Sequence, residues 1–91
     1  MRLQVTKRFK RAYKRLSPQQ IKQTDKAIRL LMTDPQSKSL RFRALEGSNR
    51  YWIASVNRGD RLILGKLEDD LFELLDIGEH DKTYRKWNRL K

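Results

Sequence analysis

Cysteine is absent from this 91-residue sequence, and glycine, proline and histidine are scarce, with four, two and one residue respectively. Without cysteine the chain forms no disulfide, offers no thiol nucleophile and holds no zinc through thiolates. Its apolar runs are all far shorter than the roughly 18–20 residues that cross a membrane. The first residues lead into a basic amphipathic segment without the apolar core of a secretory signal, so we expect a cytoplasmic protein that does not contact a membrane.

Acidic residues are also few: 11 Asp and Glu stand against 22 Lys and Arg, which gives a net charge of +11. Residues 1–16 contain seven Lys or Arg and no acid, whereas residues 68–81 contain seven acids and no Lys or Arg. An excess of this kind is typical of proteins that bind a polyanion or an acidic partner. The acidic block lacks organised carboxylates and extra histidines, so we expect neither a metal site nor a cofactor.

A single domain over residues 1–91 is expected, because the chain is long enough for only one hydrophobic core. Leu3 and Val5 alternate with polar residues and indicate a short first strand. Residues 7–16 carry apolar side chains at the spacing of one helix face. Ser17, followed by proline and a glutamine three residues on, predicts the start of a second helix. That helix ends before Pro35, since proline disfavours a helical residue ahead of it.

After Pro35 the apolar period changes from that of a helix to that of a strand. The last strand is the most continuously apolar, so we expect it at the centre of the sheet, ending at Gly78. Residues 80–88 form a short C-terminal helix or a tail. We therefore predict an α+β fold with two antiparallel helices packed on a twisted, mainly antiparallel sheet of four to five strands, in the order β-α-α-β-β-β-β. The later strands are predicted over residues 40–45, 51–56, 61–67 and 71–77.

Several segments, taken in chain order, are shared with one family. They are Phe9 to Leu16, the Asp34-Pro35 break, Leu45-Glu46-Gly47 ahead of Tyr51-Trp52-Ile53, Asn57-Arg58-Gly59-Asp60-Arg61-Leu62, and Ile77-Gly78-Glu79-His80-Asp81 with Tyr84 behind it. Together they resemble the RelE/ParE toxin superfamily of bacterial type II toxin–antitoxin modules, over nearly the whole chain. The resemblance implies a small basic toxin that a cognate antitoxin neutralises. Most RelE-like members cut mRNA on the ribosome, whereas ParE-like members poison DNA gyrase.

His80, Arg61 and Tyr84 are the catalytic candidates. Metal-free RNA cleavage needs a base for the ribose 2′-OH, cations that stabilise the charge developing on the phosphate, and an acid for the 5′-oxygen. A histidine, which titrates near pH 6.5 in water, suits either proton role. The resemblance places His80 and Tyr84 in the active site and Arg61 on the scissile phosphate, which a guanidinium fork binds well. The alternatives are a surface histidine paired with Asp81, a packing tyrosine and a solvated arginine.

Other basic residues are candidates for binding RNA phosphates, with a solvated surface as the alternative. The basic face of the helix over residues 7–16 suits ribosomal RNA, through counterion release, or an acidic antitoxin segment that is partly disordered alone. The candidates are Arg41, Arg43, Arg50 and Arg58 around the strands, and Lys7, Lys10, Arg11 and Lys14 on the helix.

One strand departs from the RelE pattern. The best-known RelE-type sites carry lysines on the strand that here spans residues 51–56, and this strand contains none. Proton transfer then falls to His80, Tyr84 or an acid such as Glu46 or Asp81. The sequence favours a ribosome-dependent endoribonuclease acting on mRNA, with a gyrase inhibitor or a non-catalytic antitoxin-binding protein as alternatives.

The two tryptophans have two interpretations. Trp52 and Trp87 either stack on RNA bases or pack inside the protein. Packing is the favoured interpretation, with Trp52 in the core and Trp87 covering a helix from the tail.

Overall fold

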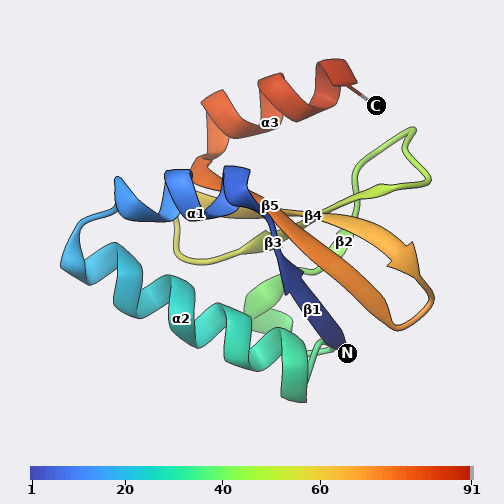
Figure 1. Ribbon diagram of the computed structural model, residues 1–91, viewed down its shortest axis with the longest axis horizontal. Coiled ribbons are helices and arrows are strands. Elements are labelled where there is room, and N and C mark those ends of the chain that lie inside the picture. The colour runs from blue at the N-terminus through green and yellow to red at the C-terminus, as the bar shows by residue number, and fades with distance from the viewer. Residues whose placement is uncertain (91) are drawn as a thin grey trace.

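The computed structural model describes residues 1–90 and packs α-helices on both faces of a five-stranded sheet (Figure 1). The α+β class and the predicted order of elements are confirmed, with a C-terminal helix in place of a tail. Within residues 1–90, no helix is long and apolar enough to cross a membrane. The elements are β1 (Arg2–Val5), α1 (Lys7–Lys14), α2 (Pro18–Thr33), a short 3-10 helix η1 (Lys38–Leu40), β2 (Arg43–Ala44), β3 (Tyr51–Ser55), β4 (Asp60–Glu68), β5 (Leu71–Glu79) and α3 (His80–Leu90).

β4 lies in the middle of the sheet, whose strand order is β1-β5-β4-β3-β2. β1 pairs in parallel with β5, and the other three pairs are antiparallel. The prediction that the apolar β5 is central is therefore wrong, because β5 is second from one edge. Its continuous apolar sequence reflects coverage on both faces, since α1 and α3 both contact it.

The two N-terminal helices begin at well-formed caps. The Thr6 side chain accepts a hydrogen bond from the backbone of Phe9 at the start of α1. Ser17 and Gln20 form a reciprocal capping box at the start of α2, as the sequence predicts. A proline occupies the first turn of α2, where its missing N–H has no helical partner to lose.

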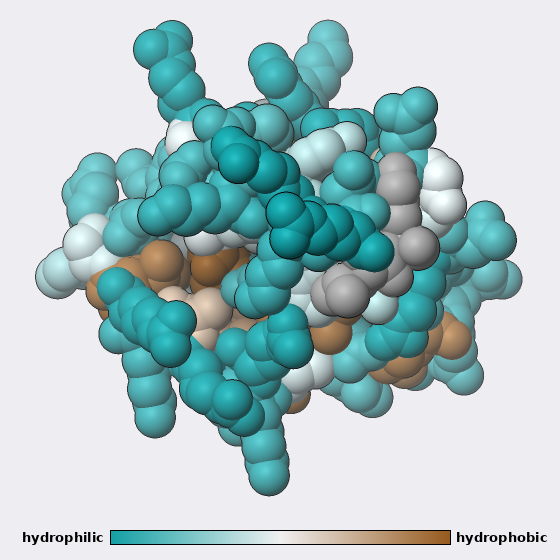
Figure 2. Space-filling view, turned by 90° about the horizontal axis from the view of Figure 1, so that it is seen from above, coloured by the Kyte–Doolittle hydropathy of each residue, from teal (hydrophilic) through white to brown (hydrophobic). Residues whose placement is uncertain are grey.

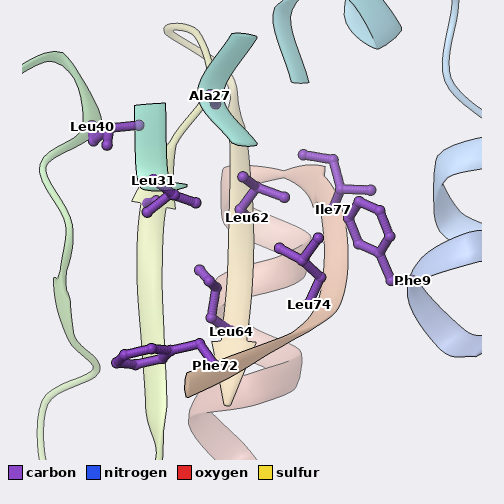
Figure 3. Packing of buried hydrophobic residues seen from close by; sticks show 10 residues of the cluster. Phe9, Ala27, Leu31, Leu40, Leu62, Leu64, Phe72, Leu74 and Ile77 are labelled. Atoms are coloured by element: carbon purple, nitrogen blue, oxygen red, sulfur yellow. The ribbon is translucent and has the colours of Figure 1, made fainter. Parts of the chain in front are cut away.

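One hydrophobic cluster lies between the sheet and helices α1 and α2. Figure 3 shows Leu62 and Leu64 on β4 and Leu74 on β5 turned toward Ala27 and Leu31 of α2, with the α1 side chain Phe9 beside Ile77. Leu31, Leu62 and Leu64 are completely buried. This cluster fixes the helical hairpin over one face of the sheet.

A second, smaller cluster covers the opposite face of the sheet, under α3. It consists of Leu45, Ile53, Ile63, Leu75 and Trp87. Trp87 is only 4% exposed, and its indole N–H donates to Asp76 Oδ2 over 2.8 Å. Its packing role is confirmed, and base stacking is excluded because its ring faces are covered.

Trp52 is half-buried and packs against the rings of Phe42 and Phe72, with centroids 4.8 and 5.5 Å away. It therefore belongs to an aromatic cluster beside the first hydrophobic cluster, as the favoured interpretation predicts.

The strand predicted over residues 40–45 is wrong. A 3-10 helix ends at Leu40, Arg41 follows in the left-handed conformation at φ 45°, and only Arg43–Ala44 pairs with β3. The alternation of Leu40, Phe42 and Ala44 suggests one strand, but Leu40 lies in the 3-10 helix and only Arg43 and Ala44 pair with β3.

Gly78 does not end the last strand, which continues to Glu79. A Cβ atom at position 78 would lie 2.7 Å from Thr83 Oγ1 of α3. The missing side chain therefore allows α3 to begin at His80 and to fold back closely over the end of β5.

Candidate nucleic-acid interface and active site

A basic cleft of about 630 Å³ lies at the end of the sheet where β3 turns into β4. Four cationic side chains line it, contributed by the η1 segment and by the β3–β4 turn. Within residues 1–90, none of these four side chains has an acidic partner within ion-pair distance. The lining residues are Lys38, Ser39, Arg41, Ser55, Val56, Asn57, Arg58 and Arg61.

Arg61 organises the turn beside this cleft. Its Nη1 donates hydrogen bonds to the backbone carbonyls of Asn57 and Asp60, over 2.8 and 2.9 Å, and to that of Arg58 over 3.3 Å. Burial, together with the nearby charges of Arg43 and Arg41, lowers the pKa of Arg61 below its ordinary value. A group of cations that destabilise one another in this way is stabilised by a bound anion.

The turn that carries Arg58 and Arg61 is anchored to α2 by a polar network. Asn57 Oδ1 accepts from the backbone N–H of Gly59 and Asp60, and its Nδ2 donates to Asp60 Oδ2 over 2.8 Å. Gln20 of α2 also donates to Asp60 Oδ2, over 3.1 Å. The turn is thereby held in one conformation, which presents its arginines to the cleft.

Arg41 and Ser55, which also line the cleft, each have an unusual feature: a left-handed backbone conformation at Arg41 and, among the described residues, an unpaired buried hydroxyl at Ser55. Arg41 is the one residue other than glycine with positive φ among residues 1–90. Such conformations cost of order 1–3 kcal/mol and gather at functional sites. Ser55, which faces Arg61 in the β3–β4 register, has a buried Oγ without a hydrogen-bond partner within the described structure. The cleft therefore combines four cations with a buried hydroxyl group that has no hydrogen-bond partner within residues 1–90.

His80 and Tyr84 lie at the start of α3, at this same end of the sheet. The backbone N–H of His80 donates to the carbonyl of Gly59 over 2.7 Å, so α3 begins against the Arg58-bearing turn. The two rings stack, with centroids 5.7 Å apart and planes at 29°. Asp81 Oδ1 lies 3.3 Å from His80 Nδ1 and so orients the imidazole.

The predicted residues do not all gather here. Arg41, Arg58 and Arg61 line the cleft, and Arg43 acts on it through its charge. Arg50 lies at the far end of β3, where it pairs with Glu73 and covers the ring of Tyr51. Arg50 is predicted to bind phosphate, but it does not line this cleft.

The basic residues of α1 separate into two stripes. Lys10 and Lys14 flank an apolar recess of about 480 Å³ between β1, α1 and α2, lined also by Val5, Phe9, Tyr13, Asp25, Ile28 and Leu74. Arg11 lies on the other side of the helix, in a polar groove of about 280 Å³ shared with α3 and lined by Arg8, Arg11, Ala12, Arg15, Asp76 and Lys86. Lys7 is exposed and lines neither hollow.

Some residues of these sites are missed by sequence reasoning. Lys38 precedes the misassigned strand, and Ser55 is one small polar residue among many; no signal marks either. Asp76, by contrast, is a carboxylate inside a continuously apolar strand, and this anomaly signals a specific partner. It is 7% exposed and binds Trp87 and Lys86. Among residues 1–90, no three His, Asp or Glu side chains gather as metal ligands.

Several solved structures share this fold. YafQ from Escherichia coli strain BL21(DE3) superimposes with a TM-score of 0.73 at 21% identity, covering 91% of this chain and 98% of YafQ. The E. coli DinJ–YafQ toxin–antitoxin complex gives 0.72 at 21%, covering 88% and 92%. The archaeal RelE–RelB complex from Pyrococcus horikoshii OT3 gives 0.68 at 17%, covering 86% and 92%.

No curated protein sequence matches the chain. At the level of families, however, the sequence pattern of the ParE-like toxins matches residues 3–88, nearly the whole chain. The chain therefore belongs to the ParE-like toxins of type II bacterial toxin–antitoxin systems.

Proposed function

We propose that this toxin is an endoribonuclease that cleaves ribosome-bound mRNA and so stops translation. One observation carries the proposal: a stacked imidazole and phenol at the start of α3 lie against the turn that presents Arg58 and Arg61 to the basic cleft. A proton-transfer group together with guanidinium groups that have no acidic partner is what phosphodiester cleavage requires. A protein that acts on gyrase by binding alone has no need of that combination.

Each side chain has a defined part in the proposed reaction. Asp81 favours the tautomer of His80 in which Nδ1 carries the proton, which leaves Nε2 to accept the proton of the ribose 2′-OH. The 2′-oxygen attacks the adjacent phosphorus, and the bond to the 5′-oxygen breaks. Arg61 Nη1 is hydrogen-bonded to the backbone carbonyls of the turn. Its remaining N–H groups donate to the phosphate oxygens and stabilise the negative charge that develops there. The Tyr84 hydroxyl donates a proton to the departing 5′-oxygen.

Induction of the chain alone tests this function. Mapping of mRNA 5′ ends and of plasmid topology in the same cells distinguishes a nuclease from a gyrase inhibitor. We expect new mRNA ends in coding regions, with supercoiling unchanged. The variants His80→Ala and Arg61→Lys are expected to lose the cuts while accumulating to the same level. Relaxed or broken plasmid with intact mRNA would contradict the nuclease and favour the gyrase interpretation.

An acidic antitoxin is the proposed partner, and the lysine-flanked recess beside α1 is its proposed docking place. The recess offers apolar side chains, with Val5 51% exposed, between Lys10 and Lys14. A segment with an apolar stripe flanked by Asp or Glu fits both features, and it folds as it binds.

Paired charge reversal tests this docking. Lys10→Glu with Lys14→Glu is expected to weaken the complex with the co-expressed antitoxin at least tenfold at low salt and to make its affinity less dependent on salt. Lys22→Glu with Lys26→Glu makes the same change of charge at exposed positions of α2, outside the recess, and serves as the control. Equal losses for the two pairs would exclude the recess.

A further inference from the structure

The groove between α1 and α3 is separate from the basic cleft and from the antitoxin recess. α1 forms one wall, with Arg8, Arg11 and Arg15, and α3 contributes Lys86. Figure 2 looks down on the side that carries α3 and shows a surface composed mostly of hydrophilic side chains, with long ones projecting outward. The groove is therefore a polar, cationic surface, unlike the apolar recess on the lysine side of the same helix.

The cations of this groove are partly fixed before any ligand arrives. The Arg8 guanidinium lies 5.2 Å from the centroid of the Trp87 ring, and Lys86 Nζ lies 3.2 Å from Asp76 Oδ2. Asp76 is satisfied by Lys86 and Trp87 and by the backbone N–H of Ile77, so its charge is already offset. Holding cations in place reduces the entropy that a ligand must remove on binding.

Arg11 and Arg15, in contrast, have no acidic partner within residues 1–90, and both are exposed. With Arg8 they occupy positions i, i+3 and i+7, so that one line of guanidinium groups runs for about 10 Å along α1. An evenly spaced line of cations matches a ligand with a charge on every unit. Guanidinium also binds phosphate oxygens with two parallel hydrogen bonds.

We propose that this arginine groove binds the phosphate backbone of duplex RNA. The backbone, rather than unpaired bases, is the fitting ligand because the groove offers no free aromatic face: Trp87 is buried and Arg8 covers it. An acidic protein segment fits less well, because Ala12 is the one apolar side chain in the lining. The proposal rests on the ribonuclease function and deepens it, because it gives the toxin a second binding site for folded RNA, away from the cleavage cleft.

Binding of a 20-base-pair RNA duplex to the purified toxin, followed by fluorescence anisotropy across a salt series, tests the groove. Arg11→Gln with Arg15→Gln is expected to weaken binding roughly tenfold at low salt and to reduce the slope of log affinity against log salt by about 2. Lys22→Gln with Lys26→Gln removes the same charge at the same helical spacing on α2 and controls for net charge. We expect a smaller loss and a nearly unchanged slope for this control.

Two outcomes would overturn the proposal. Equal losses for the two pairs would mean that total charge, and not the groove, holds the duplex. A loss of antitoxin binding with unchanged duplex binding in Arg11→Gln/Arg15→Gln would make the groove a protein site. Failure of the ribonuclease function is distinguishable, since it would leave arginine-dependent duplex binding in place while mRNA stays intact.

Discussion

The imidazole of His80 lies over the phenol ring of Tyr84, one turn further along α3, with ring centroids 5.7 Å apart. Tyr84→Phe keeps this stack and removes only the hydroxyl. If the hydroxyl protonates the leaving oxygen, as proposed, cleavage falls about 100-fold or more. Single-turnover cleavage of ribosome-bound mRNA measures the effect. Tyr84→Phe with unchanged cleavage would reduce Tyr84 to a support for His80.

Gly78 is predicted to be required for the docking of α3. Gly78→Ala places a Cβ atom 2.7 Å from Thr83 Oγ1, so the Thr83 side chain or the helix that carries both Thr83 and His80 must shift. We expect a loss of about 1–3 kcal/mol in the free energy of unfolding, together with reduced cleavage. Urea unfolding of the single variant measures it.

Thr83→Ala removes the atom that the new methyl group meets, so it should recover much of the loss in the double variant. The double-mutant cycle is then strongly non-additive. Additive losses would show that Gly78 acts through its backbone freedom and not through space for α3.

Most of the fold is predictable because its signals are local. The Ser17 cap and the Pro35 break each act within a few residues, and their elements form where expected. The misassigned strand has a non-local cause: Leu40, Phe42 and Ala44 alternate as in a strand, but Leu40 is buried in the first hydrophobic cluster from a 3-10 helix. Periodicity does not report which residues pair with a neighbouring strand, and here only Arg43 and Ala44 pair with β3.

The candidate site also has features that the sequence predicts and features that only the fold determines. The Arg61 turn and the His80–Tyr84 spacing are contained in short segments, so the sequence indicates both. The sequence predicts Arg50 and Arg58 at one site because the two flank β3, yet a five-residue strand separates them by about 13–17 Å. The two stripes of α1 are visible as alternating Lys and Arg, but only packing against α3 and α2 gives them different surroundings.

Arg41 is predicted to lower stability while serving the cleft. It adopts φ 45°, a region in which glycine is unstrained, and its charge acts on Arg61. Arg41→Gly removes both the strain and the repulsion, so we expect unfolding to require about 1 kcal/mol more free energy. Cleavage is expected to fall roughly tenfold, since one phosphate contact is lost. Thermal unfolding and cleavage assays on the same preparation test whether stability rises while cleavage falls. A variant that is both less stable and fully active would contradict this role.

Tyr13 links α1 to α2 through its hydroxyl, which donates to Asp25 Oδ1 over 2.7 Å. This hydrogen bond, with burial and the negative charge of Asp25, raises the pKa of Tyr13 above 10.0. Because the folded state holds this proton more tightly than the unfolded state, the contribution is fully present below pH 10 and is lost as the pH rises through the folded pKa. Tyr13→Phe should therefore cost about 1 kcal/mol at pH 8, and the gap from the unsubstituted protein should close above pH 10. Urea unfolding at pH 8, 9, 10 and 11 follows that gap, while lysine deprotonation affects both proteins alike. A gap that stays constant to pH 11 would mean that the Tyr13–Asp25 hydrogen bond does not contribute to the stability of the helical hairpin.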